Sequence, residues 1–153
     1  MYSASRSPDG MSRYGASLNL VKCLGLLGGM SWESSIEYER TINRLVRARL
    51  GGVASADLII RSFNFAQIEA LQEAGDWPAA GRLLTGAAVD LQAAGAEGIV
   101  ICTNTMHRLF AEVEAAVTVP VLHIADPTAD AITAAGLTTV ALLGTRYTME
   151  QSF

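Results

Sequence analysis

The chain has 153 residues, half of them hydrophobic and 17% charged, so it can form one domain with a sizeable core and is not intrinsically disordered. The net charge is −4 and the basic residues are scattered, which argues against binding to nucleic acid, because a phosphate backbone needs clustered Lys and Arg. No apolar run approaches the roughly 20 residues that span a bilayer, so we expect no membrane association.

From Val21 onward, short apolar runs alternate with longer segments of helical periodicity. Strands separated by helices of this length predict an α/β fold, with a parallel β-sheet flanked by helices. Capping residues, prolines and glycines mark the helix ends. In chain order, the predicted elements are a strand at Val21–Leu27, a helix from Ser31 to Leu50, a strand at Asp57–Ser62, a helix from Asp76 to Ala94, a strand at Glu97–Cys102, a helix at Asn104–Ala116, a strand at Val119–Ile124, a helix that Asp126 and Pro127 open and Gly136 ends, and a strand at Thr138–Leu143.

Residues 1–19 are rich in Ser, Gly and Arg and lack the apolar segment of a signal peptide. They are expected to form a disordered tail, or an extension upstream of a true start at Met11. The two cysteines, Cys23 and Cys102, stand far apart, whereas a disulfide scaffold would use more of them and a zinc site would need clustered ligands. We therefore expect reduced thiols in a cytoplasmic protein without a metal, with Cys23 packed in the core.

Two distant segments of the chain are similar to each other. Leu24–Gly28 (LGLLG) and Val140–Gly144 (VALLG) are both apolar runs that end in glycine shortly before a predicted helix start. Chance similarity between two buried strands is one explanation. The other is a domain division in which residues 20–136 form a first lobe and residues 137–153 begin a similar, truncated second lobe.

Ligands of open parallel sheets bind beyond the carboxyl ends of the strands. At several of these ends, glycine or a small hydroxyl residue directly precedes a predicted helix, whose exposed N–H groups and dipole suit a carboxylate or phosphate. The spacing matches neither a GxGxxG nor a GKS/T nucleotide motif. The turns concerned are Gly28–Ser31, Ser62–Asn64, Cys102–Thr105, Ile124–Asp126 and Gly144–Arg146.

The segment Cys102–His107 (CTNTMH) places a thiol, two hydroxyls, an amide and an imidazole at the end of one predicted strand. A purely structural interpretation is also available, with Asn104 or Thr105 as a helix N-cap and Cys102 as a small buried hydrophobic residue. His107 could cap the helix or orient its neighbours. Asp126 could be a carboxylate behind the site, but its neighbour Pro127 favours an N-cap.

Three segments occur in the order found in aspartate/glutamate racemases: Gly28–Ser34 (GGMSWES), Cys102–His107 (CTNTMH) and Leu143–Met149 (LGTRYTM). Ala94–Val100, which leads into the second motif, strengthens the match. From residue 21 to residue 153, the chain resembles the N-terminal part of a cofactor-independent amino-acid racemase of this family. The subgroup it resembles most contains broad-specificity and L-aspartate/glutamate racemases.

The resemblance implies racemisation of an amino acid, or binding of a dicarboxylate, without pyridoxal phosphate or another cofactor. In this family the substrate lies in a cleft between two similar lobes, with an acid/base group on each face of its α-carbon. Both groups are cysteines, whose thiol pKa near 8.5 can be lowered at a helix N-terminus. The first comes from the strand-to-helix motif of lobe one, and the second from a Gly-Cys-Thr-Glu-type motif late in the chain.

This chain departs from the family pattern at both cysteines. The first family motif reads Cys-Asn-Thr, but here Thr103 stands at the cysteine position and Cys102 lies one residue upstream. Because one step along a strand turns the side chain to the other face, we expect Thr103 to face the site and Cys102 to point away. Both stay candidates for the acid/base role, since a bulge would reverse this. No cysteine follows Cys102, so we expect a half-site that is inactive by itself.

By the same resemblance, two turns should hold the substrate carboxylate, and Ser62 and Asn64 are placed to touch its side chain. Three alternatives stay open: a non-catalytic carboxylate-binding module, a related isomerase of the maleate isomerase or hydantoin racemase type, and a homodimer in which Cys102 of a second copy completes the pair. The residues expected at the carboxylate are Met30, Ser31, Asn104 and Thr105, with Thr145 and Thr148 in the equivalent turn of the second lobe.

Overall fold

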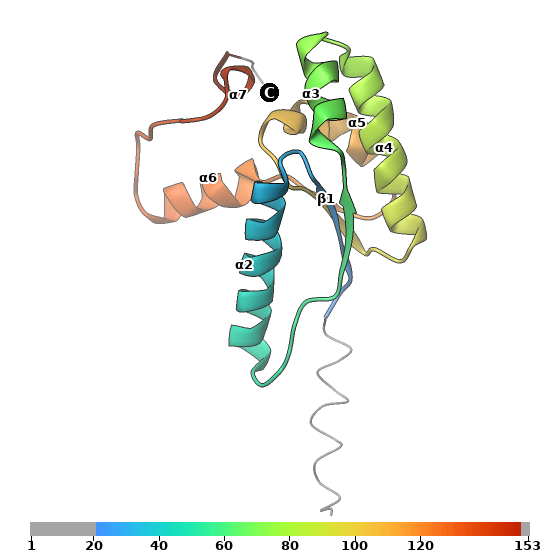
Figure 1. Cartoon of the computed structure of the whole chain (residues 1–153). Helices are drawn as coiled ribbons and strands as arrows, with labels where there is room; N and C mark the ends of the chain where they lie inside the picture. Colours follow the sequence, from blue (N-terminus) through green and yellow to red (C-terminus); the bar gives the residue numbers. More distant parts are fainter. Residues whose placement is uncertain (1–20, 151–153) are drawn as a thin grey trace, which may run out of the picture.

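The computed structural model describes residues 21–150, in which strands and helices alternate along the chain (Figure 1). The expectation of a disordered tail at residues 1–19 lies outside these residues. The strands are β1 (Leu24–Gly28), β2 (Leu58–Ser62), β3 (Gly98–Ile101) and β4 (Val121–Leu122). The helices are α2 (Trp32–Leu50), α3 (Phe65–Glu73), α4 (Trp77–Ala93), the 3₁₀ helix η2 (Thr105–Leu109), α5 (Phe110–Ala116), α6 (Ala125–Ala134) and α7 (Arg146–Glu150).

The four strands form one parallel sheet in the order β2-β1-β3-β4. β1 is central, pairing Leu26 with Ile60 on one side and with Val100 on the other. β3 is buried along its whole length, because it consists of apolar residues and has neighbours on both edges. The predicted α/β fold with a parallel sheet flanked by helices is therefore confirmed.

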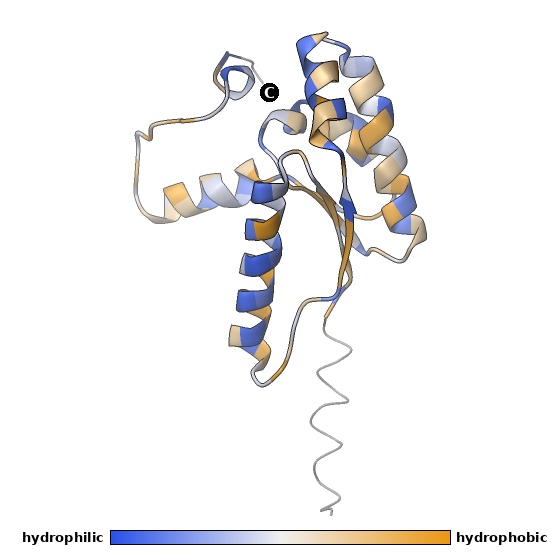
Figure 2. Cartoon of the chain, in the orientation of Figure 1, coloured by the Kyte–Doolittle hydropathy of each residue, from blue (hydrophilic) through white to orange (hydrophobic). Residues whose placement is uncertain are grey.

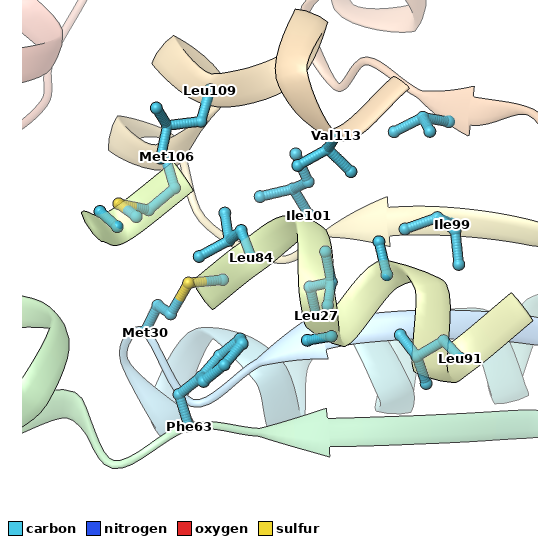
Figure 3. Close-up of a cluster of buried hydrophobic side chains, with 14 of the residues drawn as sticks. Leu27, Met30, Phe63, Leu84, Leu91, Ile99, Ile101, Met106, Leu109 and Val113 are labelled. Carbon is cyan, nitrogen blue, oxygen red and sulfur yellow. The ribbon is translucent and has the colours of Figure 1, made fainter. Parts of the chain in front are cut away.

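Helices cover both faces of the sheet (Figure 1). On one face, α2 packs Tyr38 and Ile42 against a small cluster of Leu26, Val100 and Cys102. The other face carries the larger core, in which α4 and the η2–α5 segment pack against β1 and β3 (Figure 3). Hydrophobic residues concentrate on the strands, while α2 is largely hydrophilic (Figure 2). In the large core, Leu27, Ile99 and Ile101 from the strands meet Leu84 and Leu91 from α4 and Met106, Leu109 and Val113 from η2 and α5.

Short polar residues begin two of the helices. The Asn64 side chain accepts a hydrogen bond from the Ala66 amide at the start of α3, and Asp76 accepts one from the Ala79 amide at the start of α4. Helix α4 was predicted within a residue or so at each end, but α3 was not predicted. The start of α6 differs from expectation, because Ile124 occupies the N-cap position. Asp126 lies inside the first turn, so its prediction as the N-cap is wrong.

The predicted fifth strand, Thr138–Leu143, is not a strand. The segment is exposed throughout, and in Figure 1 it runs away from the sheet toward α7. A strand needs a neighbouring backbone for its hydrogen bonds, and none of the described strands lies beside this segment. Apolar composition alone therefore gave the wrong prediction here.

Two smaller expectations also need correction. β4 spans Val121–Leu122 instead of Val119–Ile124, because it is an edge strand that pairs with β3 alone. Cys23 is half-buried rather than in the core: it lies just before β1, and its amide donates to the Glu97 carboxylate. None of the helices in residues 21–150 combines the length and apolar character needed to cross a membrane.

Candidate active site

A cavity of about 320 Å³ lies at the carboxyl ends of β1 and β3, where the chain turns into α2 and η2. This is the edge at which open parallel sheets bind their ligands. Most of its lining residues are polar and uncharged, and among the residues that the structure describes Tyr38 is the one titratable side chain in the wall. The lining residues are Met30, Ser31, Ser34, Tyr38, Phe65, Gln72, Thr103, Asn104, Thr105, Gly144, Thr145 and Thr148.

The predicted convergence of two turns on one concavity is confirmed. Met30 and Ser31 after β1, and Asn104 and Thr105 after β3, all line the cavity. Thr145 and Thr148 join them from the end of the described chain. Two further predicted residues do not: Ser62 lies exposed at the end of β2, and the Asn64 side chain is used to cap α3. Neither contributes to the cavity wall.

The turn after β1 is rigidly built. Gly29 has φ +78°, and a Cβ there would collide with the backbone of Phe63. The Gly29 amide donates to the Ser35 hydroxyl at 2.8 Å, and that hydroxyl donates to the Ser31 carbonyl at 3.2 Å. Ser31 occupies the N-cap position of α2, but its side chain makes no cap hydrogen bond. The turn thus places Met30 and Ser31 at the cavity.

Three threonine hydroxyls meet in the cavity. Thr105 Oγ1 lies 3.0 Å from Thr145 Oγ1 and 3.4 Å from Thr148 Oγ1, and the latter two lie 3.3 Å apart. We call this the hydroxyl cluster. The segment that carries Thr145 and Thr148 is anchored by Tyr147, whose hydroxyl donates to the Gln72 carbonyl at 3.4 Å and whose ring packs edge-on against Trp77. Residues 40 positions apart in sequence are thereby joined.

Cys102 and Thr103 occupy different environments. Cys102 is fully buried in the cluster under α2, where its thiol donates to the Val100 carbonyl. Burial raises the pKa of this thiol from 9.0 to about 12. Thr103 is half-buried and lines the cavity. The predicted alternation, with Thr103 at the cavity and Cys102 away from it, is confirmed.

His107 lies behind the cavity and is buried, with 4% of its surface exposed. Its Nδ1 is 2.7 Å from the Thr103 carbonyl oxygen, and the Ile124 amide donates to its Nε2 at 3.4 Å. The ring contacts His123 edge-on and stacks on Phe110. Burial lowers the pKa of His107, and the nearby His123 lowers it further, against the opposing hydrogen bond to Thr103. Since η2 has no side-chain cap bond, the His107 side chain does not cap this helix.

Sequence reasoning missed Tyr38 and Gln72 at the cavity wall. Tyr38 could have been found, because Ser31, Ser34 and Tyr38 recur at the three- and four-residue spacing of one helix face. Its pKa is raised by burial and, to a smaller extent, by the Cys102 thiol. Gln72 lies on α3, a helix that was not predicted. It contacts Met106 Sδ at 3.1 Å, so only the packing of α3 on η2 brings it to the site.

A second cavity of about 580 Å³ adjoins the first and shares Tyr38, Asn104 and Thr148 with it. Its remaining wall comes from His107, His123, the α6 region and Leu142, and it is mainly apolar. Within residues 21–150, no group of three or more His, Cys, Asp or Glu side chains is placed to hold a metal ion.

The chain is similar to a known protein family and to two proteins of known structure. The family model described as Asp/Glu/Hydantoin racemase matches residues 27–153. A crystal structure of a protein from Yersinia pestis, provisionally described as an Asp/Glu racemase, is 56% identical in sequence with a TM-score of 0.81 over 86% of this chain. An aspartate racemase homologue from Pyrococcus horikoshii OT3 is 34% identical with a TM-score of 0.69 over 76% of this chain.

The chain covers 57% and 50% of these two relatives, respectively, so it spans about half of their length. The match nevertheless includes the turns after β1 and β3 and the segment around α7, which together form the cavity. The structural similarity to these two proteins agrees with the parallel α/β fold described above. The chain therefore belongs to the Asp/Glu/hydantoin racemase family.

Proposed function

We propose that the cavity binds the carboxylate of an acidic amino acid, aspartate or glutamate, and provides one half of a cofactor-independent racemase site. The observation that carries this proposal is the hydroxyl cluster of Thr105, Thr145 and Thr148. In a racemase of two similar lobes, residues 20–136 would be the first lobe and residue 137 onward the start of the second. The exposed course of residues 137–143, away from the sheet, is compatible with that division.

A carboxylate fits the hydroxyl cluster for a simple reason. The three hydroxyls bond to one another, and each can turn its proton toward an anion instead. Ser31 and Asn104 supply further polar groups on the facing wall. A hydrogen bond to a charged group contributes about 1.5–3 kcal/mol, so a few neutral donors are enough for weak binding without a cationic side chain.

The proposed chemistry is a two-base proton transfer. One group removes the α-proton, the electron pair of the broken C–H bond stays on the α-carbon and its carboxylate, and a second group returns a proton to the opposite face. We assign the first position to Thr103, whose hydroxyl is a weak base at neutral pH unless another group activates it. Cys102 is not assigned this role, because its thiol is buried and its pKa is about 12. The opposing group would come from outside the described residues.

A second function, binding without turnover, is favoured by one observation for this polypeptide taken alone. Within residues 21–150, Tyr38 is the one titratable side chain at the cavity wall, and its pKa is raised, so none of these lining groups has a pKa suited to proton exchange at neutral pH. The same cavity would then hold a small dicarboxylate without converting it.

The experiment that tests the proposal separates binding from catalysis. The 153-residue chain is titrated with L-aspartate, L-glutamate, succinate and a 5-substituted hydantoin by NMR, and exchange of the α-proton in D₂O is followed for each. We expect weak binding of the dicarboxylates and no measurable racemisation. Binding of the hydantoin alone would contradict the substrate class. Robust racemisation by the short chain would contradict the assignment of a half-site.

The role of Thr103 is tested by a matched pair of substitutions. In a longer polypeptide, if the reading frame continues past residue 153, Thr103→Val should lower the racemisation rate by about 10²–10⁴, the usual contribution of a placed acid or base. Thr103→Ser keeps the hydroxyl and should retain most of the activity. Equal activity of the Val and Ser variants would remove Thr103 from the mechanism.

A further inference from the structure

The His107 ring makes two hydrogen bonds that together specify its protonation state. Nδ1 lies 2.7 Å from the Thr103 carbonyl oxygen, which can only accept, so Nδ1 carries a proton. Nε2 lies 3.4 Å from the Ile124 amide nitrogen, which can only donate, so Nε2 is unprotonated. The neutral Nδ1–H tautomer is the single form that satisfies both partners.

We propose that His107 is a positioning residue that acts through this tautomer: it ties the Thr103–Asn104 peptide of the cavity to the turn between β4 and α6. Fixing the Thr103 carbonyl fixes the peptide plane, and with it the direction of the Thr103 side chain and of Asn104, both of which line the cavity. The proposal rests on the proposed function in that it assigns Thr103 a role in the site.

The surroundings of the ring favour a fixed orientation. Phe110 stacks on it with an interplanar angle of 7°, and His123 packs edge-on with a centroid distance of 4.6 Å. The backbone of His107 is also joined to this turn, since its amide donates to the Asn104 carbonyl at 3.0 Å. Of the titratable side chains, His123 faces the ring directly, and Tyr38 lies across the second cavity that both histidines line. If Nε2 were protonated, two donors would face each other, because the Ile124 amide also donates. The neutral ring is therefore the form that connects the two turns.

The first test reads the tautomer directly. The chain has two histidines, so long-range ¹H–¹⁵N NMR of the ring nitrogens gives two patterns, and His123→Asn identifies which belongs to His107. We expect His107 to show a protonated Nδ1 and an unprotonated Nε2. An Nε2–H tautomer would overturn the proposal, because it cannot accept from Ile124.

The second test uses three substitutions that remove the two hydrogen bonds of the ring separately or together. His107→Asn keeps a donor near the Nδ1 position, His107→Gln keeps an acceptor near the Nε2 position, and His107→Phe keeps a ring against Phe110 with neither. With L-aspartate as the probe, we expect the Asn variant to bind within about three-fold of the wild type, and the Gln and Phe variants to lose about ten-fold or more, since small misplacements of a site are costly. Urea unfolding of each variant measures general structural damage.

The outcomes are separable. The positioning role is supported if affinity depends on whether residue 107 keeps a donor to the Thr103 carbonyl, and not on the free energy of unfolding. Wild-type affinity in the Gln and Phe variants overturns it. If the wild-type chain binds no L-aspartate, the proposed substrate fails, but the backbone amide signals of Asn104 and Ile124 still decide this inference. Both signals should shift in His107→Phe, which keeps neither hydrogen bond, and the Asn104 signal should stay near its wild-type position in His107→Asn, which keeps the donor to Thr103. Unchanged signals in the Phe variant overturn the proposal.

Discussion

Cys102 and Thr103 are neighbours in the sequence but lie on opposite sides of the end of β3. The Cys102 side chain is fully buried against Leu26 and Val100 under α2, whereas Thr103 lines the cavity. This relationship places the thiol in the core and a hydroxyl at the cavity. It also makes the reactivity of the two positions easy to distinguish.

In the native chain, Cys102 should resist alkylation by iodoacetamide at neutral pH, because it is buried and its pKa is about 12. Thr103→Cys should introduce a thiol that reacts rapidly and is protected by L-aspartate. Peptide mass spectrometry after a timed reaction measures both, with urea-unfolded protein as the fully reactive control. Alkylation of native Cys102 at the rate of the unfolded chain would contradict the burial on which the assignment depends.

Thr105→Val should weaken binding of L-aspartate by roughly ten-fold or more, because it removes one hydroxyl from the cluster while keeping the shape of the side chain. Calorimetric or NMR titration measures the change. Thr85→Val is the matched control, since the Thr85 hydroxyl bonds to the Arg82 carbonyl on its own helix, away from the cavity. Equal affinities for the two variants would mean that the hydroxyl cluster does not contact the ligand.

Gly29→Ala should destabilise the fold by more than about 1 kcal/mol, because its positive φ and the Phe63 backbone leave no room for a Cβ. Gly86→Ala should instead stabilise it by about 0.5–1 kcal/mol, since Gly86 is exposed inside α4 with open space around it. Urea denaturation measures both free energies of unfolding. A neutral Gly29→Ala would show that the turn after β1 is more adaptable than its geometry indicates.

The free energy of unfolding should fall as the pH drops below about 6.5, the ordinary pKa of histidine. His107 has a lowered pKa in the folded state, so the unfolded chain binds the proton first. The stability is complete above the unfolded pKa and is lost progressively as the pH approaches the lower folded pKa. Denaturation curves of wild type and His107→Asn between about pH 7 and pH 5 test this, and the variant should show the smaller loss.

On the alkaline side, the free energy of unfolding should fall as the pH rises above 9.0, the reference pKa of the thiol, toward about 12. Cys102 keeps its proton in the folded state while the unfolded chain releases it, so stability is complete below 9.0 and is lost above it. Cys102→Ala should flatten this part of the curve, although Cys23 and Tyr38, whose pKa values are also raised, contribute to it. An unchanged alkaline slope in the variant would contradict the burial of the thiol.

The sequence by itself determined the parallel α/β fold, because apolar runs and helical periodicity alternate with clear glycine and cap signals. It also determined that Thr103 and Cys102 point to opposite sides, since the alternation of side chains along a strand is a local rule. The turns of Met30, Ser31, Asn104 and Thr105 could be assigned to one cavity because the carboxyl ends of parallel strands share an edge.

Only the tertiary structure decided the remaining features, because each depends on contacts between distant residues. Thr138–Leu143 has the composition of a strand, but no strand among residues 21–150 pairs with it. Gln72 reaches the cavity because α3 packs on η2, and the hydroxyl cluster forms because Tyr147 anchors its segment to Gln72 and Trp77. The neutral tautomer of His107 requires the Ile124 amide, which comes from 17 residues further along the chain and is brought to the ring by the pairing of β4 with β3.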